Sequence, residues 1–225
     1  MRVELNLATK LFPENEKFGL MLCGFEWGDP SSDIGSAGEL SFFSDAEGFG
    51  NRARYRVRLL EWFGAWGHPL ETSRMMAGGF ERSIVQTNWL PSEAKNMDNR
   101  DVHAECVAAW DNFEFHVREL QPRLVIFMSV ALLDTLNSVE CIERARALFG
   151  PEGRRHDLQA PPGLTSGGRR LRVARQMFGT TEVVAVPHPT ARFNPPETRY
   201  IAAFRDEISG ALNRYKQARG FALVK

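Results

Sequence analysis

Cysteine is scarce in this sequence, and the few cysteines present are widely separated. The chain of 225 residues contains three, Cys23, Cys106 and Cys141, all within apolar segments. They form neither a CxxC pair nor a cluster with the spacing of metal ligands. We therefore expect buried free thiols in a reducing cytoplasm, with no disulfide and no metal site.

Long apolar runs, net charge and nucleotide-binding loops are also missing. No run reaches the roughly 20 residues that a membrane-spanning helix needs, and MRVELNLATK at the start of the chain does not resemble a secretory signal. Lys+Arg and Asp+Glu are balanced at 28 each, so partners must be inferred from local charge. Neither a GxxxxGK[ST] nor a GxGxxG loop is present, which disfavours nucleoside-triphosphate hydrolysis and nicotinamide chemistry.

Short buried strands are what the sequence does contain. Hydrophobic residues make up 43% of the chain and charged residues 25%, as in ordinary globular domains. Apolar runs bounded by Gly, Pro or polar residues are typical of strands that are covered on both faces. These runs occupy residues 18–23, 83–87, 124–128 and 182–186.

Helical patterns separate the apolar runs. Apolar residues recur at helical spacing over residues 55–66, 102–120 and 130–149. A last helix is predicted to start at Asn194, because two prolines and Glu197 follow this cap residue. Strands that alternate with helices predict an α/β fold with a parallel sheet and helices on both of its faces.

Two segments are predicted to be long loops. Residues 25–50 are rich in Gly, Ser and acidic residues, and residues 150–170 are rich in Gly, Pro and Arg, with a short strand expected at 171–178. Between Gly153 and Arg175, six arginines accompany one acid, Asp157. They are Arg154, Arg155, Arg169, Arg170, Arg172 and Arg175. This pattern predicts either a surface that follows a DNA backbone or an ordinary solvated loop.

Polar residues follow the predicted strands where ligands bind in open parallel sheets. Glu26 comes shortly after the first strand, Asn88 directly after the second, and His188 after the fourth. A carboxylate, a carboxamide and an imidazole are therefore expected at one edge of the sheet. Each also has a plainer interpretation: a solvated loop carboxylate, an Asn that stabilises a turn, and a structural histidine between prolines.

The order of these segments resembles the uracil-DNA glycosylase superfamily. The motifs are GFEWGDP at 24–30, a strand ending in Asn88, ELQPRLVI at 119–126 and HPT at 188–190. The resemblance covers roughly residues 18–205, and each motif alone has low specificity. It implies a single domain over 1–225, with a three-layer α/β/α fold and a central, mostly parallel four-stranded sheet.

The resemblance also implies roles for individual residues. Glu26 and His188 would be catalytic, the first acting on water and the cationic sugar and the second on the leaving base. Asn88 would read the base edge or take part in catalysis. The other substrate-binding residues would be Gly24, Trp27 and either Phe42 or Phe43, one of which would stack on the flipped base while the other is a core residue. DNA contacts would come from Thr190, Arg192 and Phe193, with Arg169 and Arg170 from the basic loop.

Several positions depart from the family pattern. Trp27 stands where Pro is usual, Thr190 replaces Ser, and Glu26 is one methylene longer than Asp. Three cysteines are too few for the four-cysteine iron–sulfur cluster that some branches carry.

The resulting hypothesis is a monomeric, cytoplasmic DNA glycosylase. It would hydrolyse the N-glycosidic bond of a deaminated or damaged base in DNA, without cofactor, metal or membrane partner. An alternative is a nucleic-acid-binding or accessory protein that keeps the fold and lacks excision activity. A third is an enzyme that acts on free nucleosides or nucleotides.

Overall fold

The computed structural model describes residues 17–28, 54–71, 76–94, 100–189 and 196–223. Its centre is a mixed sheet with the strand order β3-β1-β5-β8-β7-β6. The four predicted runs form parallel strands: β1 (Leu20–Gly24), β3 (Ile84–Asn88), β5 (Leu124–Phe127) and β8 (Thr181–Ala185).

The prediction of a four-stranded sheet was wrong, because the described sheet has six strands. β7 (Val173–Phe178) pairs antiparallel with β8, and β6 (His156–Leu158) pairs antiparallel with β7. A tight turn at Gly179 (φ 52°) joins β7 to β8, and glycine adopts this conformation without steric cost. Two further short strands, β2 (Trp27–Gly28) and β4 (Glu93–Ala94), pair parallel to each other outside the main sheet.

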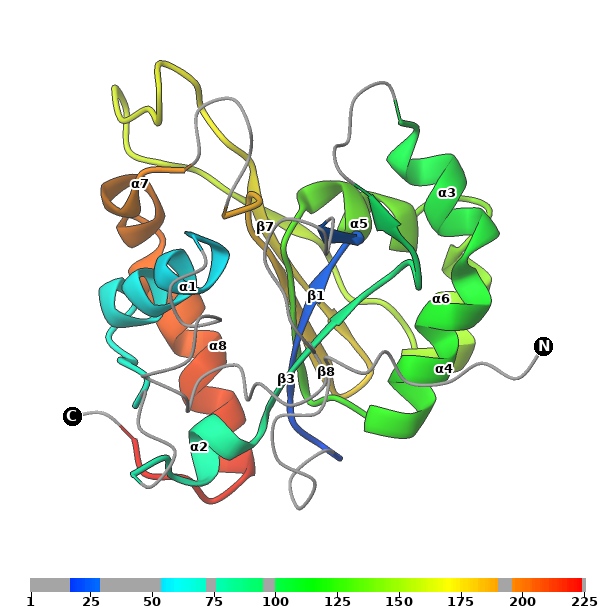
Figure 1. Ribbon diagram of the computed structural model, residues 1–225, viewed down its shortest axis with the longest axis horizontal. Coiled ribbons are helices and arrows are strands. Elements are labelled where there is room, and N and C mark those ends of the chain that lie inside the picture. Colours follow the sequence, from blue (N-terminus) through cyan, green and yellow to red (C-terminus); the bar gives the residue numbers. More distant parts are fainter. Residues whose placement is uncertain (1–16, 29–53, 72–75, 95–99, 190–195, 224–225) are drawn as a thin grey trace.

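Two apolar clusters cover the two faces of the sheet, because side chains alternate along each strand. Leu22, Ile126 and Val184 point into the first cluster, and Cys23, Phe127 and Ala185 into the second. The first is covered by α1 (Arg54–Ala65), α2 (Gly79–Arg82), α7 (Thr198–Ala202) and α8 (Arg205–Ala218). The second is covered by α3 (Val102–Ala108), α4 (Trp110–Leu120), α5 (Val130–Leu136) and α6 (Ile142–Phe149), so that helices lie on both sides of the sheet (Figure 1).

Three of the predicted helices are divided in two. The backbone leaves the α region at Ala109 (ψ 15°), which separates α3 from α4, and at Asn137 (ψ 2°), which separates α5 from α6. The side chain of Asn137 donates to the Leu133 carbonyl and to Gln176 of β7, contacts that hold the residue as a cap.

The last predicted helix begins later than the sequence suggested. Its first part, α7, starts at Thr198 with Glu197 as the cap residue, whereas Asn194 lies outside the described residues. The Glu197 amide donates to the Ser166 hydroxyl, and its carboxylate accepts from the Gly167 amide. These contacts with a distant loop, which the sequence does not reveal, fix where the helix begins.

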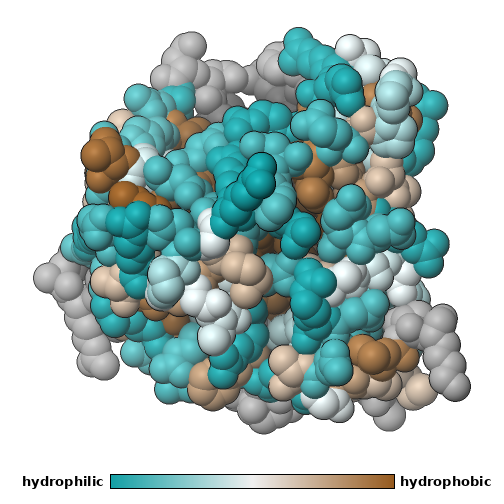
Figure 2. Space-filling view, turned by 180° about the vertical axis from the view of Figure 1, so that it is seen from behind, coloured by the Kyte–Doolittle hydropathy of each residue, from teal (hydrophilic) through white to brown (hydrophobic). Residues whose placement is uncertain are grey.

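Some large apolar residues of the described part are exposed at the surface. Figure 2 shows hydrophobic residues as separate spots among hydrophilic ones on the face seen from behind. Exposed examples in the described part are Phe18, Val57, Met76, Val139, Met177 and Leu223. None of the helices in the described ranges has the length and apolar character needed to span a membrane.

Candidate functional site

Gly24 and Asn88 lie side by side at the carboxyl ends of β1 and β3. The two residues are partners in the parallel register, and Asn88 is only 5% exposed. A Cβ atom added to Gly24 would lie 2.2 Å from Oδ1 of Asn88. The missing side chain of Gly24 therefore makes the space that the carboxamide of Asn88 occupies.

This packing predicts that Gly24→Ala destabilises the protein. The added methyl group must displace a buried carboxamide, and such overpacking typically costs about 1–3 kcal/mol. Gly64→Ala in α1 is the matched control, because nothing lies within 4 Å of its added Cβ and helical Gly→Ala stabilises by roughly 0.5–1 kcal/mol. Urea unfolding midpoints should therefore move in opposite directions. Equal shifts of both variants would contradict the close packing of Gly24 on Asn88.

Glu26 lies just beyond β1, where a cation and a hydroxyl bind its carboxylate. Its side chain is 4% exposed and forms an ion pair with Arg100. Oε2 accepts from Nη1 of Arg100, and Oε1 accepts from Nη2 at 3.3 Å and from the Ser92 hydroxyl. The prediction placed Glu26 at this edge of the sheet, but it did not identify Arg100 or Ser92 as its partners.

Hydrogen bonds from the described residues leave one acceptor position of Glu26 open. A carboxylate offers about four lone-pair sites, two on each oxygen. Among the described residues, Oε1 accepts two hydrogen bonds and Oε2 accepts one. The remaining site on Oε2 can accept a hydrogen bond from a water molecule or a hydroxyl, and Arg100 and Ser92 determine where it points.

Arg100 is itself held on three sides. Its Nε donates to both carboxylate oxygens of Glu105 in α3, at 2.9 and 3.1 Å, and its guanidinium lies 5.0 Å from the ring centroid of Phe25. The hydrogen bonds to Glu105 and Glu26 raise the pKa of Arg100 above its ordinary value. Because Arg100 binds one carboxylate at the sheet edge and one in α3, it fixes α3 against the end of β1.

His188 follows β8 and packs against an aromatic ring. Its imidazole lies 5.8 Å from the ring of Tyr55 in the first turn of α1. Burial lowers the pKa of His188 to about 4, so the ring is neutral at pH 7 with one donor and one acceptor nitrogen. Burial, and then the nearby Cys23 thiol, raise the pKa of Tyr55.

The burial of His188 predicts an acid-sensitive contribution to stability. The unfolded chain titrates near pH 6.5 and the folded imidazole near pH 4, so the unfolded state binds more protons between these values. The free energy of unfolding should therefore fall as the pH drops from about 6.5 to about 4. His188→Gln should make this dependence shallower by up to about 1.4 kcal/mol per pH unit. Urea titrations at several pH values measure it, and an unchanged slope would show a solvated ring.

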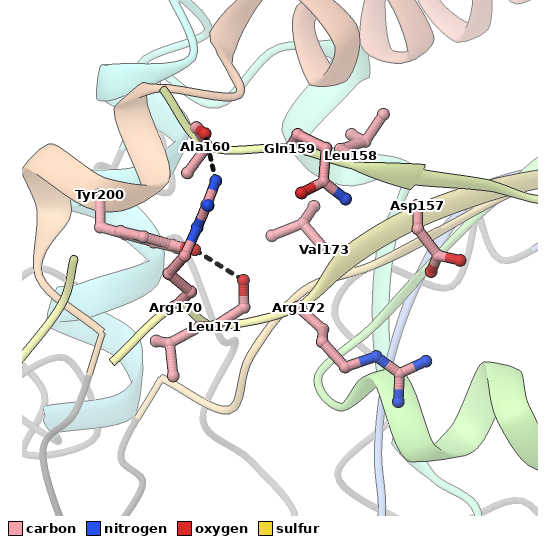
Figure 3. Close-up of a pocket in the computed structure, with 9 residues that line it drawn as sticks. All are labelled: Asp157, Leu158, Gln159, Ala160, Arg170, Leu171, Arg172, Val173 and Tyr200. Atoms are coloured by element: carbon pink, nitrogen blue, oxygen red, sulfur yellow. Dashed lines mark hydrogen bonds between the residues drawn. The ribbon is translucent and has the colours of Figure 1, made fainter. Parts of the chain in front are cut away.

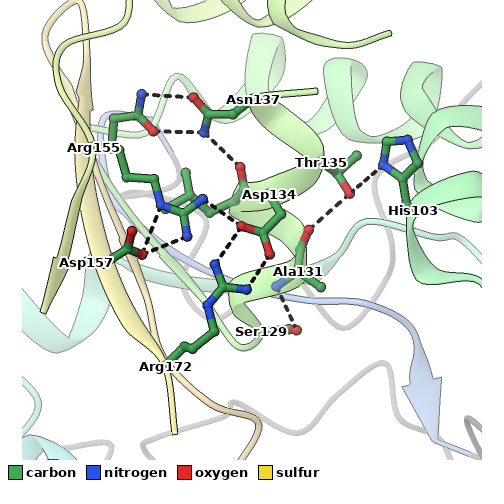
Figure 4. Close-up of polar contacts among 11 residues, drawn as sticks. His103, Ser129, Ala131, Asp134, Thr135, Asn137, Arg155, Asp157 and Arg172 are labelled. Atoms are coloured by element: carbon green, nitrogen blue, oxygen red, sulfur yellow. Dashed lines mark hydrogen bonds and ion pairs between the residues drawn. The ribbon is translucent and has the colours of Figure 1, made fainter. Parts of the chain in front are cut away.

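The arginine-rich region is less positive than its sequence indicates. Asp134 of α5 binds both Arg155 and Arg172, and Asp157 binds Arg155 as well (Figure 4). Arg175 lies 3.8 Å from Glu182 of β8. The sequence offered a single neighbouring acid, but the fold brings Asp134 and Glu182 from other elements. Arg154, Arg169 and Arg170 remain as exposed arginines without a carboxylate partner in the described part.

Several predicted site residues lie outside the described residues. These are Phe42, Phe43, Thr190, Arg192 and Phe193; for Trp27 the backbone is described, as part of β2, but the side chain is not. Of the remaining predictions, Gly24 and Asn88 are in contact, and Glu26 lies beyond the same strand end. His188 lies two strands away, with β5 between β1 and β8.

The cysteines, histidines and acidic residues of the described part do not form a metal site. Cys23, Cys106 and Cys141 are buried and unpaired, as predicted. Within the described residues, no group of three or more His, Cys, Asp or Glu side chains could hold a metal ion. No protein-family model matches the sequence and no curated protein matches it significantly, so the assignment of this site depends on its own geometry.

Proposed function

We propose that this protein is a DNA glycosylase that hydrolyses the N-glycosidic bond of a deaminated or damaged, uracil-like base. The observation that carries the proposal is the arrangement at the carboxyl edge of the sheet. There, a buried carboxylate lies just beyond β1, a buried carboxamide lies at the end of β3, and a neutral imidazole follows β8. Ligands of open α/β sheets bind at this edge.

Each group has the chemistry that this reaction needs. Glu26, through its remaining acceptor site, would orient water and stabilise positive charge on the sugar in the transition state. The neutral imidazole of His188 would donate a hydrogen bond to the leaving base as negative charge develops on it. Asn88 would bind the base edge, with one donor and one acceptor held in fixed positions by its contact with Gly24.

The proposal also includes the type of fold and the DNA-binding residues. The parallel strands β3, β1, β5 and β8 would be the core of a three-layer, uracil-DNA glycosylase-like domain, with β7 and β6 as an extension. The protein would act as a cytoplasmic monomer on DNA. Arg169 and Arg170, with Thr190, Arg192 and Phe193, would contact the strand.

An excision assay tests the proposal. The purified protein is incubated with labelled oligonucleotides carrying uracil, hypoxanthine, xanthine or an oxidised pyrimidine, in single- and double-stranded form. Alkali then cleaves any abasic site. Cleavage with one lesion identifies the substrate class, and its loss in His188→Ala supports the role of the imidazole. Full cleavage by that variant would remove His188 from the mechanism.

The ion pair of Glu26 with Arg100 favours a second candidate function. A carboxylate whose charge is neutralised by an arginine stabilises a cation less well than an unpaired one. The protein would then bind nucleic acid through the same surface without cleaving the glycosidic bond. This alternative predicts salt-sensitive DNA binding with no abasic product on any lesion.

A further inference from the structure

A cavity of about 250 Å³ lies beside the antiparallel extension of the sheet (Figure 3). It is formed by the end of β6, the start of β7 and helix α7, which follows His188 in the chain. In Figure 1 the yellow loop that borders it lies with α7 at the end of the molecule toward which β1 runs. Its lining residues are Asp157, Leu158, Gln159, Ala160, Arg170, Leu171, Arg172, Val173 and Tyr200.

The loop at the edge of this cavity is closed and anchored. Nη2 of Arg170 donates to the Ala160 carbonyl at 2.7 Å and joins the two ends of the loop. Ser166 and Arg169 exchange backbone hydrogen bonds within it, and the Ser166 hydroxyl accepts from the Glu197 amide at 2.8 Å. Compact loops that are closed at their ends are frequently functional, and here the anchoring makes the cavity wall preformed.

The charge of the cavity favours an anion. Its lining contains two arginines, Arg170 and Arg172, and one aspartate, Asp157, which leaves a net positive charge. Arg172 forms two hydrogen bonds to Asp134, and Arg155 binds both Asp134 and Asp157. Arg170 has the Ala160 carbonyl as its hydrogen-bond partner among the described residues. No other described residue accepts from Arg170, so its remaining N–H donors can bind phosphate oxygens. A guanidinium group can bind a phosphate through two parallel hydrogen bonds.

The remaining walls of the cavity can contact a planar base as well as a phosphate. Leu158, Leu171 and Val173 contribute apolar surface. The Tyr200 hydroxyl donates to the Leu171 carbonyl at 2.7 Å, so the polar atom of this side chain is satisfied. In Figure 3 the carboxamide of Gln159 points toward Val173, where it offers one donor and one acceptor to a base edge. The volume is just under the roughly 300 Å³ at which pockets for drug-sized ligands begin.

We propose that this cavity binds a nucleoside monophosphate unit. The phosphate would bind Arg170, and the base would lie between Gln159 and the apolar wall. The same chemistry is offered by a free nucleotide and by one nucleotide of a DNA strand that passes the candidate site. The assignment does not require excision activity, because it depends on the charge and shape of the cavity.

Binding of thymidine monophosphate tests the proposal on the full chain. Isothermal titration should give tighter binding of this probe than of thymidine or inorganic phosphate alone. Arg170→Gln should weaken it at least tenfold, whereas Arg154→Gln, which removes an exposed arginine that does not line the cavity, should not change it. Because Arg170 also closes the loop, Gln159→Ala serves as a second variant and should weaken thymidine monophosphate more than phosphate. Binding that both cavity variants leave unchanged would overturn the assignment.

A single-stranded thymidine oligonucleotide distinguishes the two sources of the nucleotide. If the cavity holds a nucleotide of the strand, Arg170→Gln should reduce the slope of log affinity against log salt by about 0.7, the contribution of one phosphate. If it holds a free nucleotide, only thymidine monophosphate binding should respond to the variant. Both results support the site, and neither depends on whether the protein cleaves a lesion. An unchanged response of both ligands would contradict it.

Discussion

Glu26→Gln is expected to slow excision by about 10²–10³-fold while leaving the fold intact. The substitution keeps the size of the side chain but removes the charge that stabilises the cationic sugar, and loss of one electrostatic group in a preorganised site typically costs about 10²–10³ in rate. Arg100 keeps its contacts with Glu105, so no buried cation is left alone. Single-turnover cleavage of the preferred lesion, together with urea unfolding, measures both effects.

Glu114→Gln is the matched control for this variant. Glu114 of α4 is also an arginine-paired carboxylate, bound by Arg118 and Arg144, and it lies outside the candidate site. Both variants remove one arginine-paired carboxylate, and only Glu26→Gln should affect cleavage. Wild-type cleavage by Glu26→Gln would exclude the assigned role. Wild-type DNA binding without cleavage in any variant would favour the second candidate function.

The strands could be predicted because burial on both faces leaves a simple sequence signal. Every residue of β1, β3, β5 and β8 is buried, and three of the four predicted runs lack polar alternation, as is typical of strands covered on both faces. β7 is also recognisable from its position after the basic loop, whereas β6 is exposed on its outer edge and too short to give a pattern. The sheet therefore has two strands more than the four that the family resemblance implies, and β6 is the one that the sequence did not indicate.

Helix ends and polar pairs were harder to predict because distant residues determine them. Asn137 ends α5 partly through its bonds to Gln176, 39 positions later in the chain. Glu26 and Arg100 are 74 positions apart, and Arg100 has no motif around it. Tyr55 was recognised only as the start of a helical stripe, although its ring contacts His188.

The candidate site could be predicted to the level of strand ends but not to the level of contacts. Parallel strands bring their carboxyl ends to one edge, so the approximate positions of Glu26, Asn88 and His188 follow from order alone. The acceptor site that remains on Glu26 depends on Ser92 and Arg100, which approach from two different segments. The reactivity of a carboxylate depends on whether it faces solvent or a guanidinium group. The folded structure shows this partner, and the sequence does not.

Substitution of Arg100 should show how strongly its ion pair holds the Glu26 carboxylate in place. Arg100→Gln leaves a Glu26 side chain that is 4% exposed without its cation. Breaking a buried ion pair from one side costs about 3–5 kcal/mol, and the lower end applies because Arg100 is 21% exposed. Excision should fall by about 10²-fold, since a displaced carboxylate no longer directs its acceptor site to the reacting atoms.

The double variant Glu26→Gln/Arg100→Gln separates positioning from simple destabilisation. Because it removes the buried charge together with its partner, it should recover part of the lost stability, with an interaction energy of about 0.5–3 kcal/mol between the two sites. It should not recover excision, which requires the carboxylate itself. Unfolding free energies that add without an interaction term would show a solvated, uncoupled pair. Faster cleavage by Arg100→Gln alone would show that Arg100 restrains the carboxylate, and would assign it an inhibitory role instead of a positioning role.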